Sequence, residues 1–214
     1  AHRSVVNGLI LAQLNPHWLL PEFIPQWQLW GEAPVNTLIQ ALQQFNDVAA
    51  VVITHPTYQG ISSPIAALVK QCKAHHVACI VDEAHGSLWP LHQNFPPSAL
   101  GAGADAVVHS MHKSGGSLTQ TGLLHLSSHS ALCPQRVQQV LNVLQTTSPS
   151  YPLLASIEAA CAHWQSKRGQ QQLTRHFKTL HSLAQWATQK APDLTPFFTV
   201  AEQSQRFQWL MQSP

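Results

Sequence analysis

The stretch Val77-Ala78-Cys79-Ile80-Val81-Asp82-Glu83-Ala84-His85-Gly86 decides the fold. Its first part is a short, continuous apolar run, which is typical of a strand buried in a parallel sheet. The run ends on an acidic residue, Asp82, and the polar and small residues after it indicate a loop. We therefore expect a buried strand over Val77–Asp82 with a candidate functional loop at its carboxyl end.

Similar apolar runs occur on both sides of this strand. They predict further strands at Ala49–Thr54, Ala104–Ser110 and Thr121–Ser127. Between the first two strands, Pro64–His76 carries apolar residues at the spacing of a helix. Alternating strands and helices with such short strands predict an α/β fold, in which helices flank a mostly parallel sheet.

The character of the sequence changes after the fourth strand. Helical patterns cover Gln135–Gln145, Pro152–Ser166 and Gln170–Lys190, and Pro196–Leu210 is consistent with the start of a further strand pair. A Pro- and Ser-containing turn around Ser148 separates the two parts. We therefore expect a major domain over residues 1–147 and a helical continuation over residues 148–214.

Composition excludes several classes of protein. Of the 214 residues, 44% are hydrophobic and only 9% are charged, and the net charge is +2 with no basic stripe, so nucleic acid is not an expected partner. No apolar run is long enough for a membrane span, and the start lacks a signal-peptide pattern. The cysteines have no zinc or redox spacing, which favours reduced thiols in a cytoplasmic protein. They are Cys72, Cys79, Cys133 and Cys161.

Polar motifs follow three of the predicted strands. His55–Gly60 follows the first strand, Asp82–Gly86 the second and Ser110–Gly116 the third. In open α/β sheets, ligands bind at the carboxyl ends of the strands. Because three polar loops converge on one edge, we expect the binding site there.

The residue types at this edge favour pyridoxal-phosphate (PLP) chemistry. A partly desolvated lysine such as Lys113 is a usable nucleophile and forms Schiff bases with aldehydes. An aspartate at a neighbouring strand end, here Asp82, can keep a pyridine nitrogen protonated, which makes the ring an electron sink. Ser110 and His112 flank the lysine and can hydrogen-bond a phosphate. Each residue alone is ordinary in a loop or on a surface, but the combination predicts a PLP site.

A metal site is the alternative that the 14 histidines raise. His109 and His112 are three residues apart, which on a strand places them on opposite faces. The sequence has neither the HExxH helix motif nor a Cys/His cluster. We therefore expect no catalytic metal.

Several motifs together resemble the major domain of the PLP-dependent Orn/Lys/Arg decarboxylases, which have fold type I (aspartate-aminotransferase-like). The resemblance covers roughly residues 1–165 in the family's order, and the Asp-Glu-Ala-His-Gly and Ser-x-His-Lys motifs are its most specific part. It is closest to the branch that makes polyamine precursors. The matching stretches are residues 1–8, 56–60, 82–86, 110–113 with 118–121, and 147–151.

The resemblance implies a decarboxylase of arginine, lysine or ornithine. Lys113 would hold PLP as a Schiff base, and Asp82 would pair with the pyridinium nitrogen. His2 would stack on one face of the cofactor ring and Ala84 would touch the other face. His85 would lie beside the ring hydroxyl or the substrate.

The resemblance also assigns the phosphate contacts and the assembly. Ser110 and His112 would bind the phosphate. Thr146 would reach the phosphate bound in a neighbouring subunit, so a homodimer or higher homo-oligomer is the expected working unit.

The sequence departs from the family pattern in three places. It starts on Ala1 without the upstream Gly-Ser/Thr phosphate loop, so we expect an N-terminally incomplete domain. Only the start of a C-terminal domain fits after Lys190, and Ser114–Ser117 replaces a more apolar stretch. Two alternatives stay open: another fold-type-I enzyme, such as an aminotransferase or aldolase, and a catalytically inactive truncated remnant. An aminotransferase would need an arginine for the substrate carboxylate, and no arginine here lies in a motif.

Overall fold

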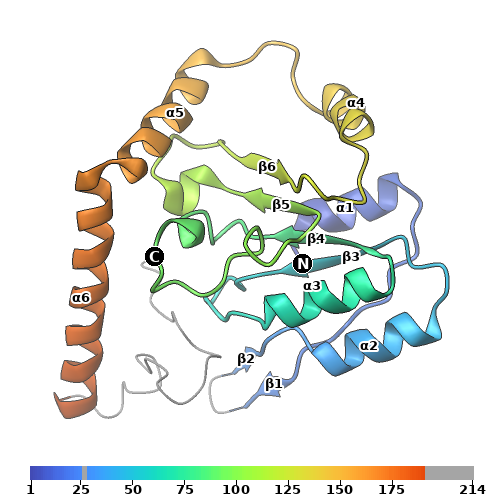
Figure 1. Cartoon of the computed structure of the whole chain (residues 1–214), viewed down its shortest axis with the longest axis horizontal. Helices are drawn as coiled ribbons and strands as arrows, with labels where there is room; N and C mark the ends of the chain where they lie inside the picture. Colours follow the sequence, from blue (N-terminus) through green and yellow to red (C-terminus); the bar gives the residue numbers. More distant parts are fainter. Residues whose placement is uncertain (26–27, 191–214) are drawn as a thin grey trace.

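The computed structural model describes residues 1–25 and 28–190 (Figure 1). The helices and strands of this part follow one another along the chain, with long connections before β1 and before β5. In order they are α1 (Arg3–Leu11), β1 (Phe23–Ile24), β2 (Leu29–Trp30), α2 (Val35–Gln44), β3 (Ala50–Thr54), α3 (Ile65–Ala74), β4 (Ala78–Asp82), the 3₁₀ turn η1 (Trp89–Leu91), β5 (Ala106–His109), the π-helical turn η2 (Met111–Gly115), β6 (Leu123–Leu126), α4 (Pro134–Leu144), α5 (Tyr151–Gln165) and α6 (Lys167–Lys190).

The main sheet has four strands in the order β3-β4-β5-β6. β3, β4 and β5 are parallel, with Val81 of β4 opposite Ile53 of β3 and Val107 of β5. β6 is antiparallel to β5, because the chain returns beside β5 after the short η2 turn instead of crossing over through a helix. The four predicted strands and the mostly parallel sheet are therefore confirmed, and the direction of β6 is a finding of the structure.

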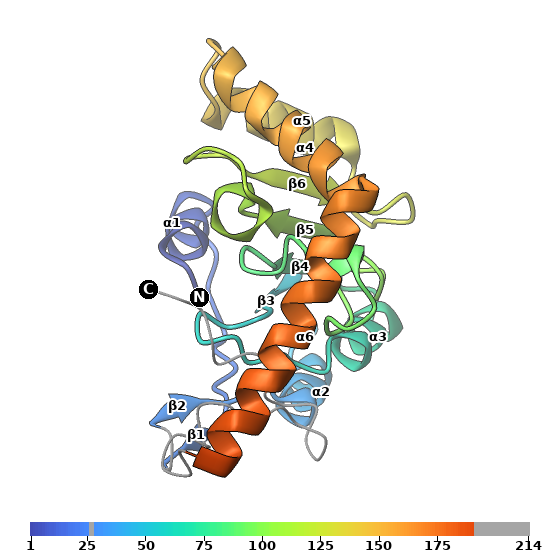
Figure 2. The same cartoon turned by 90° about the vertical axis from the view of Figure 1, so that its left-hand side faces the viewer.

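One face of this sheet is covered by α2 and α3, which lie together on the same side in Figure 2. The apolar spacing in α3 places four residues on the face that packs against the strands. Burial of these side chains with their strand partners forms the hydrophobic core, since removing apolar surface from water is the main driving force of folding. The buried cluster consists of Leu38, Leu42, Val51, Ile53, Ile65, Leu68, Val69, Cys72, Cys79, Val81, Ala99, Ala104 and Val107.

The opposite face of the sheet is largely open. Val52, Val108 and Leu124 point to this side and are 42%, 38% and 40% exposed. α1 lies on this side in Figure 2, but it buries none of its own residues. Because side chains alternate along a strand, Asp82 points to this open face and its neighbour Glu83 to the covered one.

α4, α5 and α6 follow the sheet and confirm the three helices predicted after it. α5 and α6 are separated by a break at Ser166, whose Oγ accepts a hydrogen bond from the Gly169 N–H at 3.1 Å. In Figure 1, α6 runs along the side of the molecule that faces the ends of β4 and β5. The predicted strand pair at Pro196–Leu210 lies outside the described residues, and the domain boundary near Ser148 stays a prediction.

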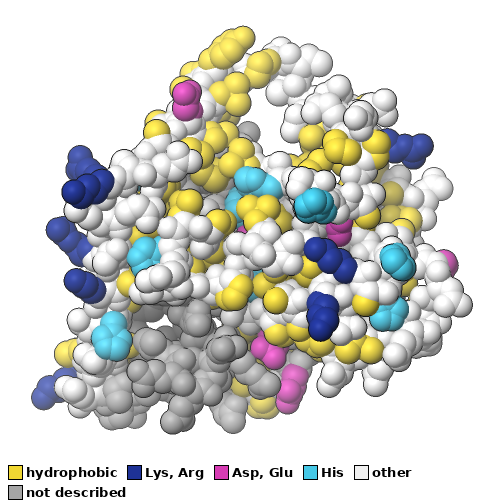
Figure 3. Space-filling model, in the orientation of Figure 1, with side chains coloured by type: hydrophobic (Ala, Val, Ile, Leu, Met, Phe, Trp, Pro, Cys, Tyr) yellow, Lys and Arg dark blue, Asp and Glu magenta, His cyan; other side chains and the backbone are white. Residues whose placement is uncertain are grey.

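The elements not expected from the sequence are α1, α2, the turns η1 and η2, and the hairpin of the two-residue strands β1 and β2. The four thiols are free, and Cys72 and Cys79 are buried in the core. Within the described ranges, no helix has both the length and the apolar character needed to cross a membrane. In Figure 3, the Lys and Arg side chains on the visible face are scattered, several of them along the edge formed by α6, and do not gather into a basic stripe.

Candidate active site

The parallel strands β3, β4 and β5 end at one edge of the sheet, where the three predicted polar loops begin. Asp82 ends β4, and its carbonyl accepts a hydrogen bond from the N–H of His55, which follows β3, at 3.0 Å. His109 ends β5 and Ser110 follows it directly. The structure therefore brings the three sequence motifs together, as the fold rule for α/β sheets predicts.

Lys113 lies in η2, a single π-helical turn that comes directly after β5. The turn ends at Gly116, whose φ of +87° lies in the left-handed region that favours glycine. The indole Nε1 of Trp164 in α5 donates a hydrogen bond to the Gly115 carbonyl at 2.6 Å. π-helical turns occur frequently at functional sites, and this one is fixed from outside by α5.

The amine of Lys113 contacts the imidazole of His85. The distance from Lys113 Nζ to His85 Nε2 is 3.1 Å. On the other side, the ring of Tyr58 meets the His85 ring edge to face, with centroids 5.6 Å apart. Ser114, next to the lysine, shares a 2.8 Å hydrogen bond with Ser87 of the β4 loop. The loop after β4 and the turn after β5 are thus tied together around one lysine amine.

Lys113 is exposed to solvent, whereas the sequence predicted a partly desolvated lysine. The reason is its position on η2, at the end of a strand whose outer face is itself open, as the exposure of Val108 shows. The prediction of a desolvated amine is therefore wrong for this chain by itself.

Four further predicted residues lie around this lysine on the same edge, and all are partly buried. Asp82 Oδ1 accepts a hydrogen bond from the Ala84 N–H at 3.2 Å. The Ser110 N–H donates to the Ala84 carbonyl at 3.4 Å, which links the β4 and β5 loops. His112 donates from Nδ1 to the Thr121 carbonyl at 2.8 Å, so Nε2 is the acceptor nitrogen when the ring is neutral.

The structure does not bring the remaining two predicted residues into contact with Lys113. His2 caps α1, where its Nδ1 accepts a hydrogen bond from the Ser4 N–H at 3.2 Å. It is exposed, and α1, which it caps, lies on the open side of the sheet in Figure 2. Thr146 is exposed in the connection from α4 to α5, beyond the β6 edge of the sheet (Figure 1).

A cavity of about 350 Å³ adjoins the lysine turn. This volume is within the range of small-molecule sites. The loops after β3 and β4 form one wall, and α5 and α6 form the other. The lining residues are Pro56, Gly60, His85, Leu88, Trp89, Phe95, Ser114, Trp164, Gln172, Leu173 and His176.

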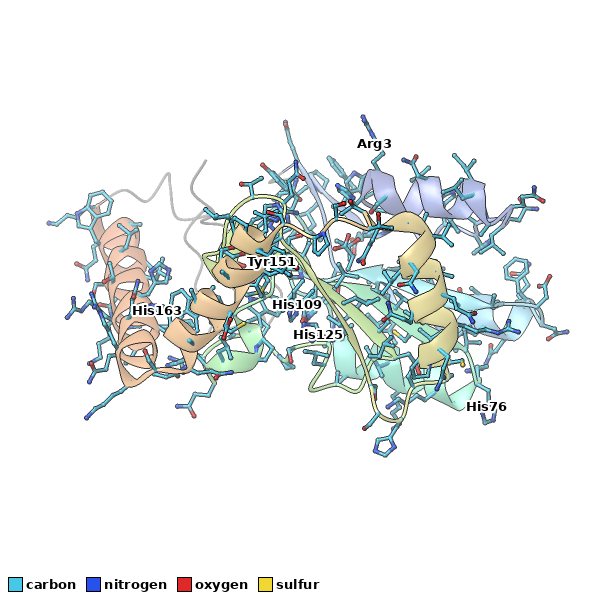
Figure 4. All side chains as sticks on the ribbon, turned by 90° about the horizontal axis from the view of Figure 1, so that it is seen from above. Arg3, His76, His109, His125, Tyr151 and His163 are labelled. Atoms are coloured by element: carbon cyan, nitrogen blue, oxygen red, sulfur yellow. The ribbon has the colours of Figure 1, made fainter. Side chains whose placement is uncertain are left out.

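A buried polar network lies directly beneath this edge, and the sequence analysis gave it no role. Glu83 is fully buried, and its Oε2 is 2.7 Å from Nε2 of His109. His109 Nδ1 is 3.2 Å from Nε2 of His125 on β6, and Figure 4 shows the two rings together in the interior. The sequence did indicate that Glu83 is buried, because Glu83 continues the alternation of the inward-facing residues Cys79 and Val81 of β4. No group of three or more His, Cys, Asp or Glu side chains that could hold a metal ion occurs in the described part of the chain.

Two histidines of this region are held neutral by burial. His55 is fully buried, and desolvation lowers its pKa below the ordinary value. Its hydrogen bonds fix the neutral tautomer, since Nδ1 accepts from the Ser63 N–H at 3.0 Å and Nε2 donates to the Pro97 carbonyl at 3.1 Å. Desolvation also lowers the pKa of His125, and His109 beside it adds to the effect.

We expect the protein to lose stability as the pH falls below about 6.5, the ordinary pKa of histidine in an unfolded chain. In the unfolded state, His55 and His125 bind protons as the pH falls through this value. In the folded state, the same two residues bind protons only at a lower pH, because their pKa values are lowered. Stability is therefore fully present above that pH, and His55 alone gives a slope of at most about 1.4 kcal/mol per pH unit. Thermal unfolding followed from about pH 7.5 to about pH 5.5 measures the effect.

The matched variant for this prediction is His125→Gln, whose amide keeps a donor for His109 but does not titrate. Its melting temperature should depend less on pH than that of the wild type. An identical pH dependence in the two proteins would show that His125 is not a source of the acid sensitivity.

A family model described as "Orn/Lys/Arg decarboxylase, major domain" matches residues 1–207. The chain belongs to the Orn/Lys/Arg decarboxylase family. It is 35% identical over 184 residues to an uncharacterized protein of Bacillus subtilis, covering 86% of this chain and 38% of the relative. It is 35% identical over 162 residues to an arginine decarboxylase of Halalkalibacterium halodurans, covering 76% of this chain and 33% of the relative. The chain thus spans little more than a third of these relatives' length.

The fold is that of solved lysine decarboxylases. The Escherichia coli constitutive lysine decarboxylase superposes with a TM-score of 0.71 at 19% identity, over 90% of this chain and 28% of that protein. Lysine decarboxylase A of Pseudomonas aeruginosa gives a TM-score of 0.71 at 18% identity, over 88% and 28%. The predicted family and the predicted α/β fold are therefore confirmed.

Proposed function

We propose that this chain forms the PLP-binding part of an enzyme that removes the α-carboxyl group of a basic amino acid. The observation that carries the proposal is the 3.1 Å contact between Lys113 Nζ and His85 Nε2 at the edge where Asp82 ends β4. An amine that can form a Schiff base and a carboxylate that can pair with the pyridinium nitrogen, both at one sheet edge, are the groups that PLP chemistry uses. Membership of the Orn/Lys/Arg decarboxylase family over residues 1–207 supports the same conclusion.

The residues at this edge fit PLP by the chemistry of their donors. Lys113 would supply the amine that holds the aldehyde carbon, and the Ser110 hydroxyl would donate to the phosphate. Because Nδ1 of His112 donates to the Thr121 carbonyl, His112 would donate to the phosphate from Nε2 when its ring carries both protons. His2 and Ala84 would bound the two faces of the ring. When bound, PLP supplies an electron sink for the electron pair that the departing CO₂ leaves behind.

Asp82 and His85 would control protons in this site. Asp82 Oδ1 accepts from the Ala84 N–H, so the second carboxylate oxygen is the one that can keep a pyridine nitrogen protonated. His85 is within hydrogen-bond distance of the Lys113 amine and can hold it in place or exchange a proton with it. After CO₂ leaves, Lys113 is the group that we expect to deliver a proton to Cα of the substrate.

We further propose that the working unit is a homo-oligomer. Lys113 is exposed in this chain, and a decarboxylation site needs surroundings that exclude water. Thr146 is exposed in the connection between α4 and α5, which runs beyond β6 in Figure 1. In a dimer, Thr146 of one copy would contact the phosphate held by the other copy.

The proposal predicts that the purified protein, incubated with PLP, releases CO₂ and the matching amine from one of three amino acids. Arginine is the first to test, because the Halalkalibacterium halodurans relative is an arginine decarboxylase. Lysine and ornithine are tested in parallel. The measurement is trapped CO₂ together with chromatography of the amine product.

The control is Lys113→Ala, which should give neither product. Keto-acid formation in place of CO₂ would show an aminotransferase instead. Absence of both products, with PLP bound at Lys113, would show an inactive remnant and would contradict the proposal for this chain.

A further inference from the structure

A buried hydrogen-bonded pair, Glu83 and His109, lies one residue from each half of the candidate site. Glu83 directly follows Asp82, and His109 directly precedes Ser110. Glu83 is 0% and His109 is 3% exposed, and their Oε2 and Nε2 atoms are 2.7 Å apart. This hydrogen bond therefore joins the end of β4 to the end of β5 from beneath.

Both carboxylate oxygens of Glu83 have partners. The Ala99 N–H donates to Oε1 at 2.7 Å, and His55 Nε2 lies 4.0 Å from the same oxygen. His109 is held from its other side by His125 at 3.2 Å. A fully buried carboxylate is costly unless it is paired in this way, so the network requires one defined arrangement.

The Glu83 side chain also shapes the loop that carries His85. A Cβ added at Gly86 would lie 2.6 Å from Glu83 Cγ, so the loop folds directly over this side chain. The same loop is tied to the lysine turn through Ser87 and Ser114 at 2.8 Å. Displacement of Glu83 would therefore move His85 relative to Lys113.

We infer that the Glu83–His109 hydrogen bond positions His85 against Lys113. Glu83 and His109 are then positioning residues for the reaction. The inference rests on the proposed function for its consequence in turnover, but its structural part concerns only this chain's own residues. The Asp82 side chain lies on the open face, and Glu83 and His109 hold the ends of β4 and β5 from the covered face.

The test compares three variants of the pair. Glu83→Gln replaces the carboxylate by a neutral amide. The Ala99 N–H and His109 Nε2 both contact the Glu83 carboxylate, so the amide NH₂ group would face one of these two donors. His109→Phe removes the bond, and His109→Gln keeps a donor for Glu83. Leu68→Ala is the matched control, because Leu68 is 1% exposed in the same core but lies on α3, away from the edge.

The first readout needs no cofactor. The ¹⁵N chemical shifts of the His85 imidazole report its contact with Lys113, and Lys113→Ala supplies the reference for loss of that contact. We expect Glu83→Gln and His109→Phe to shift the His85 signal toward that reference. His109→Gln and Leu68→Ala should keep the wild-type signal.

The second readout is turnover with PLP. A misplacement of about 1 Å at a reacting group can cost about 10²-fold in rate. We therefore expect kcat to fall about 10²-fold in Glu83→Gln and in His109→Phe, and KM to change much less. His109→Gln should recover most of kcat. A purely structural pair would lower the melting temperature as Leu68→Ala does and leave both kcat and the His85 signal unchanged.

The outcomes separate this inference from the proposed function. A wild-type His85 signal in His109→Phe and Glu83→Gln overturns the inference, whatever the protein does with PLP. If Glu83→Gln or His109→Phe does not fold, the His85 signal of the other variant still tests the inference. The recovery of kcat and of the His85 signal in His109→Gln tests it as well. Absence of PLP binding by the wild type would overturn the proposed function. The His85 measurement would still test the inference, because it needs no cofactor.

Discussion

Replacement of Lys113 by alanine is expected to abolish covalent attachment of PLP and all turnover that depends on it. The reason is chemical, since only a side-chain amine at this position can form the linkage to the aldehyde. Lys113 Nζ is the amine beside His85 and at the same sheet edge as Asp82. An absorbance scan with saturating PLP should show the visible band of the lysine-linked cofactor in the wild type and none in Lys113→Ala.

Borohydride reduction followed by peptide mass spectrometry makes this prediction specific to one residue. The reduced adduct should map to the peptide that contains Lys113. Lys70→Ala is the matched control, because Lys70 is an exposed lysine on α3, on the covered side of the sheet. An adduct spread equally over several lysines, or no band in the wild type at saturating PLP, would refute the assignment of Lys113.

The fold was predictable where local pattern and burial agree. The strands at 50–54, 78–82 and 106–109 are apolar runs because the sheet core demands apolar side chains, so their sequence signal is strong. α2 was missed although it is as long as α3 and its residues Leu38 and Leu42, four positions apart, are buried in the core, so the helical signal was present in the sequence. The direction of β6 depends on the path of the chain after η2. That path is set by tertiary contacts, so it could not be predicted from the local sequence.

The candidate site was predictable to the extent that it follows from strand ends. Lys113 and Asp82 were assigned from their positions at strand ends and His85 from the family resemblance, and the structure places Lys113 and His85 in contact. The exposure of Lys113 was not predictable, because it depends on what covers the outer face of the sheet. Glu83 and His109 were missed because buried polar pairs are recognised by their partners, and those partners come from different strands.

Replacement of Asp82 by asparagine is expected to lower kcat for decarboxylation by about 10²–10³-fold, the usual cost of losing one electrostatic group from an active site. An ionised carboxylate can keep the pyridine nitrogen protonated, and a neutral amide cannot. The amide oxygen introduced by Asp82→Asn would still accept from the Ala84 N–H, which the Asp82 carboxylate binds at 3.2 Å. The fold and the attachment at Lys113 should therefore persist, so the substitution isolates the charge.

Steady-state rates, the absorbance band and the melting temperature of Asp82→Asn are to be measured together. We expect a lost rate with a retained band and an unchanged melting temperature. Asp47→Asn, a change at an exposed aspartate before β3, supplies the matched control and should leave the rate intact. If Asp82→Asn kept wild-type kcat, the ring nitrogen would not depend on this carboxylate, and the assignment of Asp82 would fall even with Lys113 confirmed. The two substitutions thus test different halves of the proposed site, since Lys113 is expected to hold the cofactor and Asp82 to make it reactive.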